Sequence, residues 1–155
     1  MKRFGHFAKN EEGGSLVEFA IAGSLLFMML FGIIEFSFAF YSFNFTAEAA
    51  KEAARYAAVR GGNSCSGTVH LSDCGITSTQ LQTVVQNMGY PGINANSTTV
   101  SVAWPDTCSD TGAANCTEPG SNVQVNVSYQ FPLSVPFWKA TTLTMHSTAE
   151  MVISN

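Results

Sequence analysis

The chain has 155 residues, which is enough for one domain and an anchor but too few for two complete hydrophobic cores. Charged residues make up only 12% of it, and every Lys and Arg except Lys139 lies at or before Arg60. From Gly61 onward five acids accompany that single base, so this part lacks the basic surface that phosphate groups require. We therefore expect no nucleic-acid partner.

The first element is an apolar run from Gly13 to Ala47 that contains no Lys or Arg and two acids, Glu18 and Glu35. A membrane span needs about 20 residues, and residues 16–35 supply them, followed by a phenylalanine-rich collar typical of a membrane interface. A charge in lipid costs roughly 2.5–3.5 kcal/mol on insertion scales, so Glu18 is a candidate functional residue.

A cleaved secretory signal is the alternative explanation of this run, and Ala47-Glu48-Ala49 fits its exit pattern. The uninterrupted apolar stretch at 16–45 is however about twice the length of a signal's apolar core. We therefore prefer a membrane span to a cleaved secretory signal.

The same run continues into an alanine-rich segment, and no proline interrupts it between Ser15 and Arg60. The composition predicts one continuous helix that Gly61-Gly62-Asn63 ends. Such a helix is about 70 Å long, roughly twice the bilayer core. Its second half is therefore expected to leave the membrane and pack on the remainder of the chain.

Beyond residue 60 the pattern predicts one short helix and three strands. Leu81, Val84, Val85 and Met88 recur at helical spacing, with Thr77 or Ser78 as the cap. Strict alternation predicts the strands, and Pro132 and Pro136 are expected to end the second one. The expected ranges are helix 77–88 and strands 100–104, 123–131 and 143–153. The fold class is thus α+β, with the long helix covering a small antiparallel sheet.

The four cysteines all lie beyond the apolar run, which favours disulfides in an oxidising compartment over a zinc site. Local pairing, Cys65 with Cys74 and Cys108 with Cys116, is the preferred one of three possibilities. Basic residues are balanced on the two sides of the span, so the cysteines decide the orientation. They place the N-terminus in the cytoplasm and the C-terminal part outside it.

No catalytic constellation is visible in the chain. His6, His70 and His146 lack the spacing of metal ligands, and no nucleophile elbow or phosphate loop is present. We expect neither enzymatic activity nor a cofactor nor a metal.

Three pieces of the first 61 residues together resemble one family. They are Gly-Gly-Ser-Leu-Val-Glu-Phe-Ala at 13–20, Gly-Ile-Ile-Glu-Phe-Ser at 32–37, and Ala-Ala-Lys-Glu-Ala-Ala-Arg-Tyr-Ala-Ala-Val-Arg-Gly at 49–61. This combination resembles the TadE-like proteins of the tight adherence (Tad, or Flp) pilus machinery. The final two strands are weakly similar to the family's C-terminal layout.

The resemblance implies a pilin-like precursor with a cytoplasmic leader at 1–13, cut by prepilin peptidase after Gly13 so that Gly14 becomes the new N-terminus. A cut after Gly14, or no cut at all, stays open. The freed amine could pair with Glu18 of a neighbouring subunit, and Phe19 and Glu35 are further candidate subunit contacts. The alternative for Glu18 and Glu35 is an acid that reaches the membrane interface.

These expectations define three parts: the leader, a helix at 14–60, and an exported disulfide-containing domain at 61–155. The implied function is that of a minor pilin or pseudopilin, single-pass in the bacterial inner membrane. Its implied partners are prepilin peptidase, other pilin and pseudopilin subunits, the inner-membrane assembly platform and lipid. The alternatives are a main filament subunit and a permanently anchored periplasmic ligand-binding or sensor ectodomain.

Overall fold

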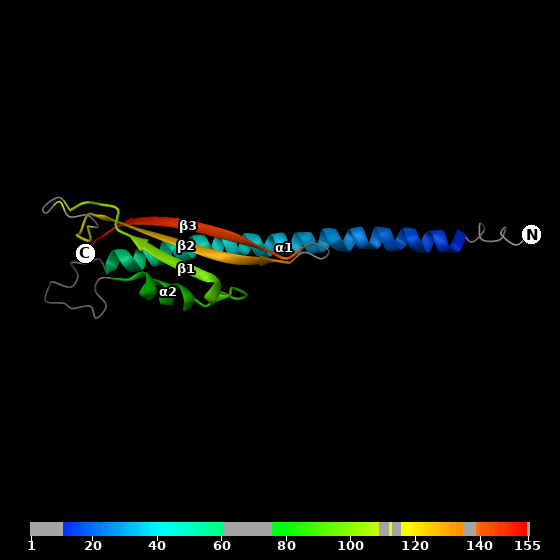
Figure 1. The fold of residues 1–155 in the computed structure, drawn as a ribbon, viewed down its shortest axis with the longest axis horizontal. Coiled ribbons are helices and arrows are strands. Elements are labelled where there is room, and N and C mark those ends of the chain that lie inside the picture. The colour runs from blue at the N-terminus through cyan, green and yellow to red at the C-terminus, as the bar shows by residue number, and fades with distance from the viewer. Residues whose placement is uncertain (1–10, 61–75, 109–111, 113–115, 135–138, 155) are drawn as a thin grey trace, which may run out of the picture.

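The computed structural model describes residues 11–60, 76–108, 112, 116–134 and 139–154. One long helix carries a small layer of sheet and helix along its C-terminal half (Figure 1). The α+β class expected from the sequence is confirmed. In chain order the described elements are α1 (Glu11–Val59), α2 (Ser78–Gln86), the short 3₁₀ helix η2 (Ala95–Ser97), β1 (Thr98–Ala103), β2 (Asn122–Leu133) and β3 (Thr141–Val152).

The helix α1 is one uninterrupted element of 49 residues, as its composition predicts. Its N-terminal half projects away from the rest of the molecule, whereas its C-terminal half lies along the sheet (Figure 1). The glycine segment expected to end it, residues 61–63, lies outside the described residues. The long helix therefore has two environments, and the sheet marks the boundary between them.

The core is the seam between α1 and the sheet. The helix contributes a face of small side chains with no exposed surface, which lets its backbone approach the sheet closely. Val123, Val125 and Val127 of β2 meet this face and are likewise fully buried. The helix residues of the seam are Ala49, Ala50, Ala53, Ala54 and Ala57. Close-packed apolar surface of this kind is the main favourable term in folding.

The sheet is antiparallel with β2 in its centre, and the strand order is β1-β2-β3. Val127 pairs with Val100 on one side and with Ser147 on the other. The inward side of β2 consists of odd-numbered residues from Val123 to Phe131, which is the phase that the alternation predicts.

The expectation that Pro132 ends the second strand is wrong, because β2 continues to Leu133 and Pro132 pairs with Thr142 of β3. The pairing of β1 with β2 stops at Tyr129, so β2 has a free edge on that side at position 132. A residue without an N–H group is tolerated where its backbone nitrogen faces no neighbouring strand. Pro136, the second expected breaker, lies outside the described residues.

The helix α2 begins where its capping chemistry predicts. The Thr77 hydroxyl accepts from the backbone N–H of Gln80, and the Gln80 side chain accepts from the backbone N–H of Thr77. This reciprocal capping box satisfies two donors that the first turn leaves free. Leu81 and Val85 then point into the core, and both are almost completely buried.

Cys108 and Cys116 form a disulfide that closes part of the loop between β1 and β2. This is the local pairing expected for the second cysteine pair. Cys65 and Cys74 lie outside the described residues, as does His70. The backbone N–H of Cys116 also donates to the carbonyl of Asp106 at 2.8 Å, which ties the loop back to the end of β1.

The seam predicts a sharp dependence on side-chain size. Ala53→Leu adds three carbons where no exposed surface remains, so we expect a loss of about 1–3 kcal/mol in the free energy of unfolding. Glu52→Leu adds apolar volume one position earlier on an exposed site and should change stability by less than about 0.5 kcal/mol. Denaturant unfolding of the full chain in detergent measures both, and equal effects would contradict the close helix–sheet approach.

Candidate membrane and subunit-contact surface

The projecting half of α1 exposes nearly all of its large apolar side chains. The segment has a mean hydropathy of 2.2 over its most apolar window, and none of that window is buried by the rest of the protein. Exposed apolar surface on this scale requires lipid or other protein helices as its environment. Its members include Leu16, Phe19, Ile21, Leu25, Leu26, Phe27, Met28, Met29, Leu30, Phe31, Ile33, Ile34, Phe36, Phe38, Phe40, Tyr41 and Phe43.

The exposed apolar surface therefore reaches Phe43, which is eight residues beyond the span expected at 16–35. At 1.5 Å per residue, residues 16–43 extend over about 40 Å, which matches a hydrocarbon core together with part of an interface. The phenylalanines at 36–43 occupy the end next to the sheet, where an aromatic belt is expected.

Three polar side chains along this surface bond to the helix itself. Ser24 and Ser37 donate to carbonyls three or four residues earlier at 2.8 Å, and Asn44 donates to the carbonyl of Phe40 at 3.1 Å. Ser42 and Thr46 donate in the same way at 2.9 and 2.7 Å, but both are buried against the domain. Groups satisfied in this way need no water, so they can be transferred into lipid at low cost.

Glu18 carries an exposed carboxylate that forms no ion pair within the residues that the structure describes. Phe19 beside it is 80% exposed. Gly13 and Gly14 lie in the first turns of α1, and a Cβ atom added at either one would meet nothing. The candidate cleavage bond is thus helical here, in a turn that two glycines weaken by about 1 kcal/mol each.

Glu35 belongs to a different face from Glu18. Seventeen residues at about 100° each place the two carboxylates about 100° apart around the axis and about 25 Å apart along it. Glu35 is half-buried and precedes Ala39 and Ser42 by four and seven residues, so it shares the side that turns toward the domain. The two acids therefore cannot serve one subunit contact.

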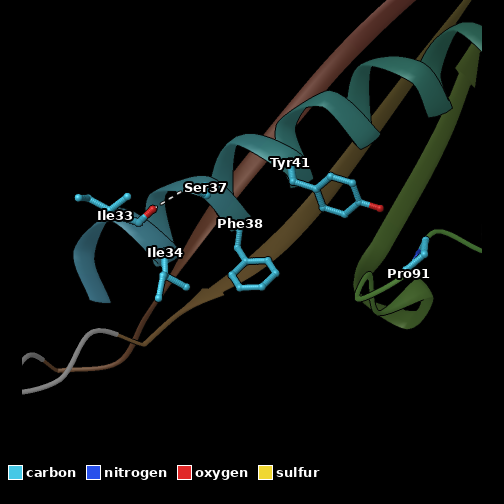
Figure 2. Close-up of a pocket in the computed structure, with 6 residues that line it drawn as sticks. All are labelled: Ile33, Ile34, Ser37, Phe38, Tyr41 and Pro91. Atoms are coloured by element: carbon cyan, nitrogen blue, oxygen red, sulfur yellow. Dashed lines mark hydrogen bonds between the residues drawn. The ribbon is translucent and has the colours of Figure 1, made fainter. Parts of the chain in front are cut away.

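A groove of about 500 Å³ lies where α1 emerges from the domain. Ile34, Phe38 and Tyr41 form one wall of it, and Pro91, from the turn after α2, lies across from them (Figure 2). Phe45 holds the turn to the helix. Its ring lies edge-on to those of Tyr90 and Tyr129, with ring centroids 4.8 and 6.0 Å apart. No part in the core is predicted for this turn from the sequence, although the aromatic Tyr90 is an available signal for one.

Comparison with known proteins locates the similarity on this same helix. A family model described as TadE-like protein matches residues 13–55. No curated protein and no solved structure matches the chain. The matched segment comprises the projecting half of α1, with Glu18 and Glu35, and most of the alanine seam. The resemblance drawn from the sequence is confirmed over this segment, which is similar to the TadE-like family.

Proposed function

We propose that the chain is a minor pilin or pseudopilin of the Tad pilus, processed by prepilin peptidase and without enzymatic activity. The observation that carries the proposal is the lone carboxylate of Glu18 at the start of an exposed apolar helix. A helix that only anchors a domain has no need of this charge, and its cost in lipid argues for a partner.

Cleavage after Gly13 supplies such a partner. It creates a positively charged amine on Gly14, four residues from Glu18 and close to the same membrane face. The amine of one subunit and the Glu18 carboxylate of its neighbour neutralise one another in a medium of low dielectric, where their attraction is strong. Pairing therefore fixes how far each subunit is displaced along its neighbour.

The remainder of the chain serves contacts outside the membrane in this proposal. The exported part carries five acids and one base, a formal charge of −4, and the Cys108–Cys116 disulfide is compatible with an oxidising compartment. A main filament subunit needs little more than the helix, so the appended sheet domain favours a minor component. Pilin and pseudopilin subunits, the assembly platform and lipid are the proposed partners.

The proposed topology predicts position-dependent labelling by a membrane-impermeant maleimide. In cells with a permeabilised outer membrane, Glu52→Cys should react from the periplasm, because position 52 is exposed beside the sheet. Met29→Cys, at the centre of the apolar half, should stay unlabelled. The unsubstituted chain is the control for the native cysteines. Equal labelling of both variants would contradict a membrane-embedded helix, and labelling only after inner-membrane lysis would reverse the orientation.

Processing predicts a specific mass for the mature chain. Intact mass of the membrane-extracted protein should show loss of residues 1–13 in cells with prepilin peptidase and the full chain in cells without it. Gly13→Leu should block the cut, because the bulky side chain then precedes the scissile bond. Loss of residues 1–14 would move the cut by one position, and retention of Met1 or Lys2 in peptidase-containing cells would contradict the precursor model.

The carboxylate predicts an assembly defect without an insertion defect. Glu18→Ala leaves a neighbour's amine unpaired in a poorly solvated site, and breaking such a pair costs about 3–5 kcal/mol. We expect normal membrane levels but no incorporation into pili, measured by fractionation and by counting pili. Ser24→Ala on the same helix removes only an internal hydrogen bond and should assemble normally. Normal piliation with Glu18→Ala would refute the pairing.

A further inference from the structure

The two edges of the sheet differ, because α2 covers the outer edge of β1. Three side chains of α2, spaced four residues apart, bond to backbone groups along the outer side of β1 and η2. The Ser78 hydroxyl accepts from the N–H of Val102 at 3.3 Å, and the Gln82 amide donates to the carbonyl of Thr98 at 3.4 Å. The Gln86 amide donates to the carbonyl of Ala95 at 3.4 Å. A further strand cannot add beside β1 while α2 occupies this position.

These contacts also determine which backbone groups of β3 face outward. The N–H of Val102 points away from β2, and backbone groups alternate in direction along an antiparallel strand. Val125, the partner of Val102, therefore directs its groups toward β3 and pairs with Ala149. The N–H of Asn122, which donates to the Asp106 carboxylate at 2.6 Å, points to the β1 side and agrees with this phase.

The even-numbered residues of β3 consequently present their N–H and C=O groups to the free edge. All six have exposed side chains, and no described residue forms a hydrogen bond across this edge. They are Thr142, Thr144, His146, Thr148, Glu150 and Val152. Over its 12 residues the strand contains no Pro, Lys or Arg, the residues that commonly block pairing at an edge.

The inner side of β3 is also incompletely covered. Leu143 is 48% exposed although its partner Phe131 is only 8% exposed. Ala149 and Met151 are half-buried, whereas their partners Val125 and Val123 have no exposed surface. A strand placed beside β3 would cover these apolar side chains while it satisfied the backbone groups.

From this geometry we infer that the edge of β3 is a docking site for an extended, basic segment of another exported protein, which adds to the sheet as a fourth strand. Main-chain hydrogen bonds along an open edge give affinity in this mode, and alternate side chains give specificity. The segment is expected to alternate apolar and polar residues. Glu150 is the only charged carboxylate on β3, and the exported part carries a formal charge of −4, so a cationic segment is complementary.

A second copy of this chain does not fit the site. The strands run along α1 (Figure 1), so antiparallel pairing of two β3 edges would direct the two helices in opposite directions. Copies anchored in one membrane with one orientation cannot adopt that arrangement, a step that rests on the proposed function. Parallel pairing would place the polar face of one sheet beside the apolar face of the other. Pairing with the β1 edge of a second copy is prevented by α2.

Thr148 allows a test at a single position. Thr148→Pro removes an N–H that faces outward and leaves the ladder between β2 and β3 intact, so the fold should be retained. Thr148→Val is the matched control, because it removes the side-chain hydrogen bond from Asn126 (2.8 Å) but keeps the backbone donor. The probe is a blocked synthetic peptide as long as β3, of alternating valine and threonine with a lysine at each end.

We expect the peptide to bind the full chain in detergent and to slow amide exchange at Thr144, His146 and Glu150. Thr148→Val should bind equally, and Thr148→Pro should bind at least about tenfold more weakly, as expected for the loss of one hydrogen bond and a steric block. The same peptide with glutamates in place of the lysines should bind less tightly. This assay involves no pilus and no peptidase, so its outcome is independent of the proposed function.

Three results would overturn the inference. One is slow exchange of these even-numbered amides in the isolated chain, equal to that of Met145 and Ala149, which would show that the edge is already covered. Another is equal binding of the peptide to the Thr148→Pro and Thr148→Val chains. The third is a dimer of the full chain that Thr148→Pro dissociates, which would make a second copy the occupant.

Discussion

The close contact between the alanine face of α1 and the valine face of β2 is the constraint on which the rest of the structure depends. The sheet has only one apolar side, and of the helices that the structure describes, α1 alone is long enough to cover it. The seam ends near Phe45, where the rings of Tyr90 and Tyr129 close the core. Beyond that point the domain covers little of the helix, so most of the large apolar side chains of residues 16–43 need an environment outside the chain.

In the proposed pilin role, this division explains how a single acid would determine assembly. Along the projecting half the apolar side chains make contacts that differ little when one helix slides past another, since such packing is non-directional. The serines and the asparagine are satisfied by their own helix and specify nothing. A charge in a low-dielectric medium has one strongly favoured position relative to its partner. In the proposed assembly, Glu18 would therefore select one stagger out of many nearly equivalent ones.

The elements with a clear period could be predicted from the sequence. The alternation from Val123 to Phe131 gave the correct inward phase of β2, and the Thr77 cap was correctly predicted as one of two candidates. The helix was predicted because no proline interrupts it and its second half is rich in alanine. Each of these depends on local chemistry alone, which is why a single sequence suffices for them.

The remaining features depend on register and tertiary contact. Pro132 is accepted in β2 only because β1 is too short to reach it, and no local pattern reports the length of a neighbouring strand. The polar face of α2 has the composition of an ordinary solvated face, and its contacts with β1 follow from how the two elements dock. For the candidate site, the sequence identified Glu18 and Glu35 but could not show that they lie on different faces relative to the domain.

The open edge of β3 raises a physical difficulty that the anchor itself resolves. A long strand with free backbone groups and no blocking residue is normally an aggregation hazard. The most favourable way for two such edges to meet in identical chains is antiparallel, with apolar side matched to apolar side. The shared orientation in one membrane that we propose would forbid that encounter, since α1 runs along the strands and fixes their direction (Figure 1). Only a segment free of this restriction can reach the edge in the matching orientation. In the proposed topology, the long helix thus prevents the edge of β3 from pairing with a second copy. The same edge stays available to a different protein.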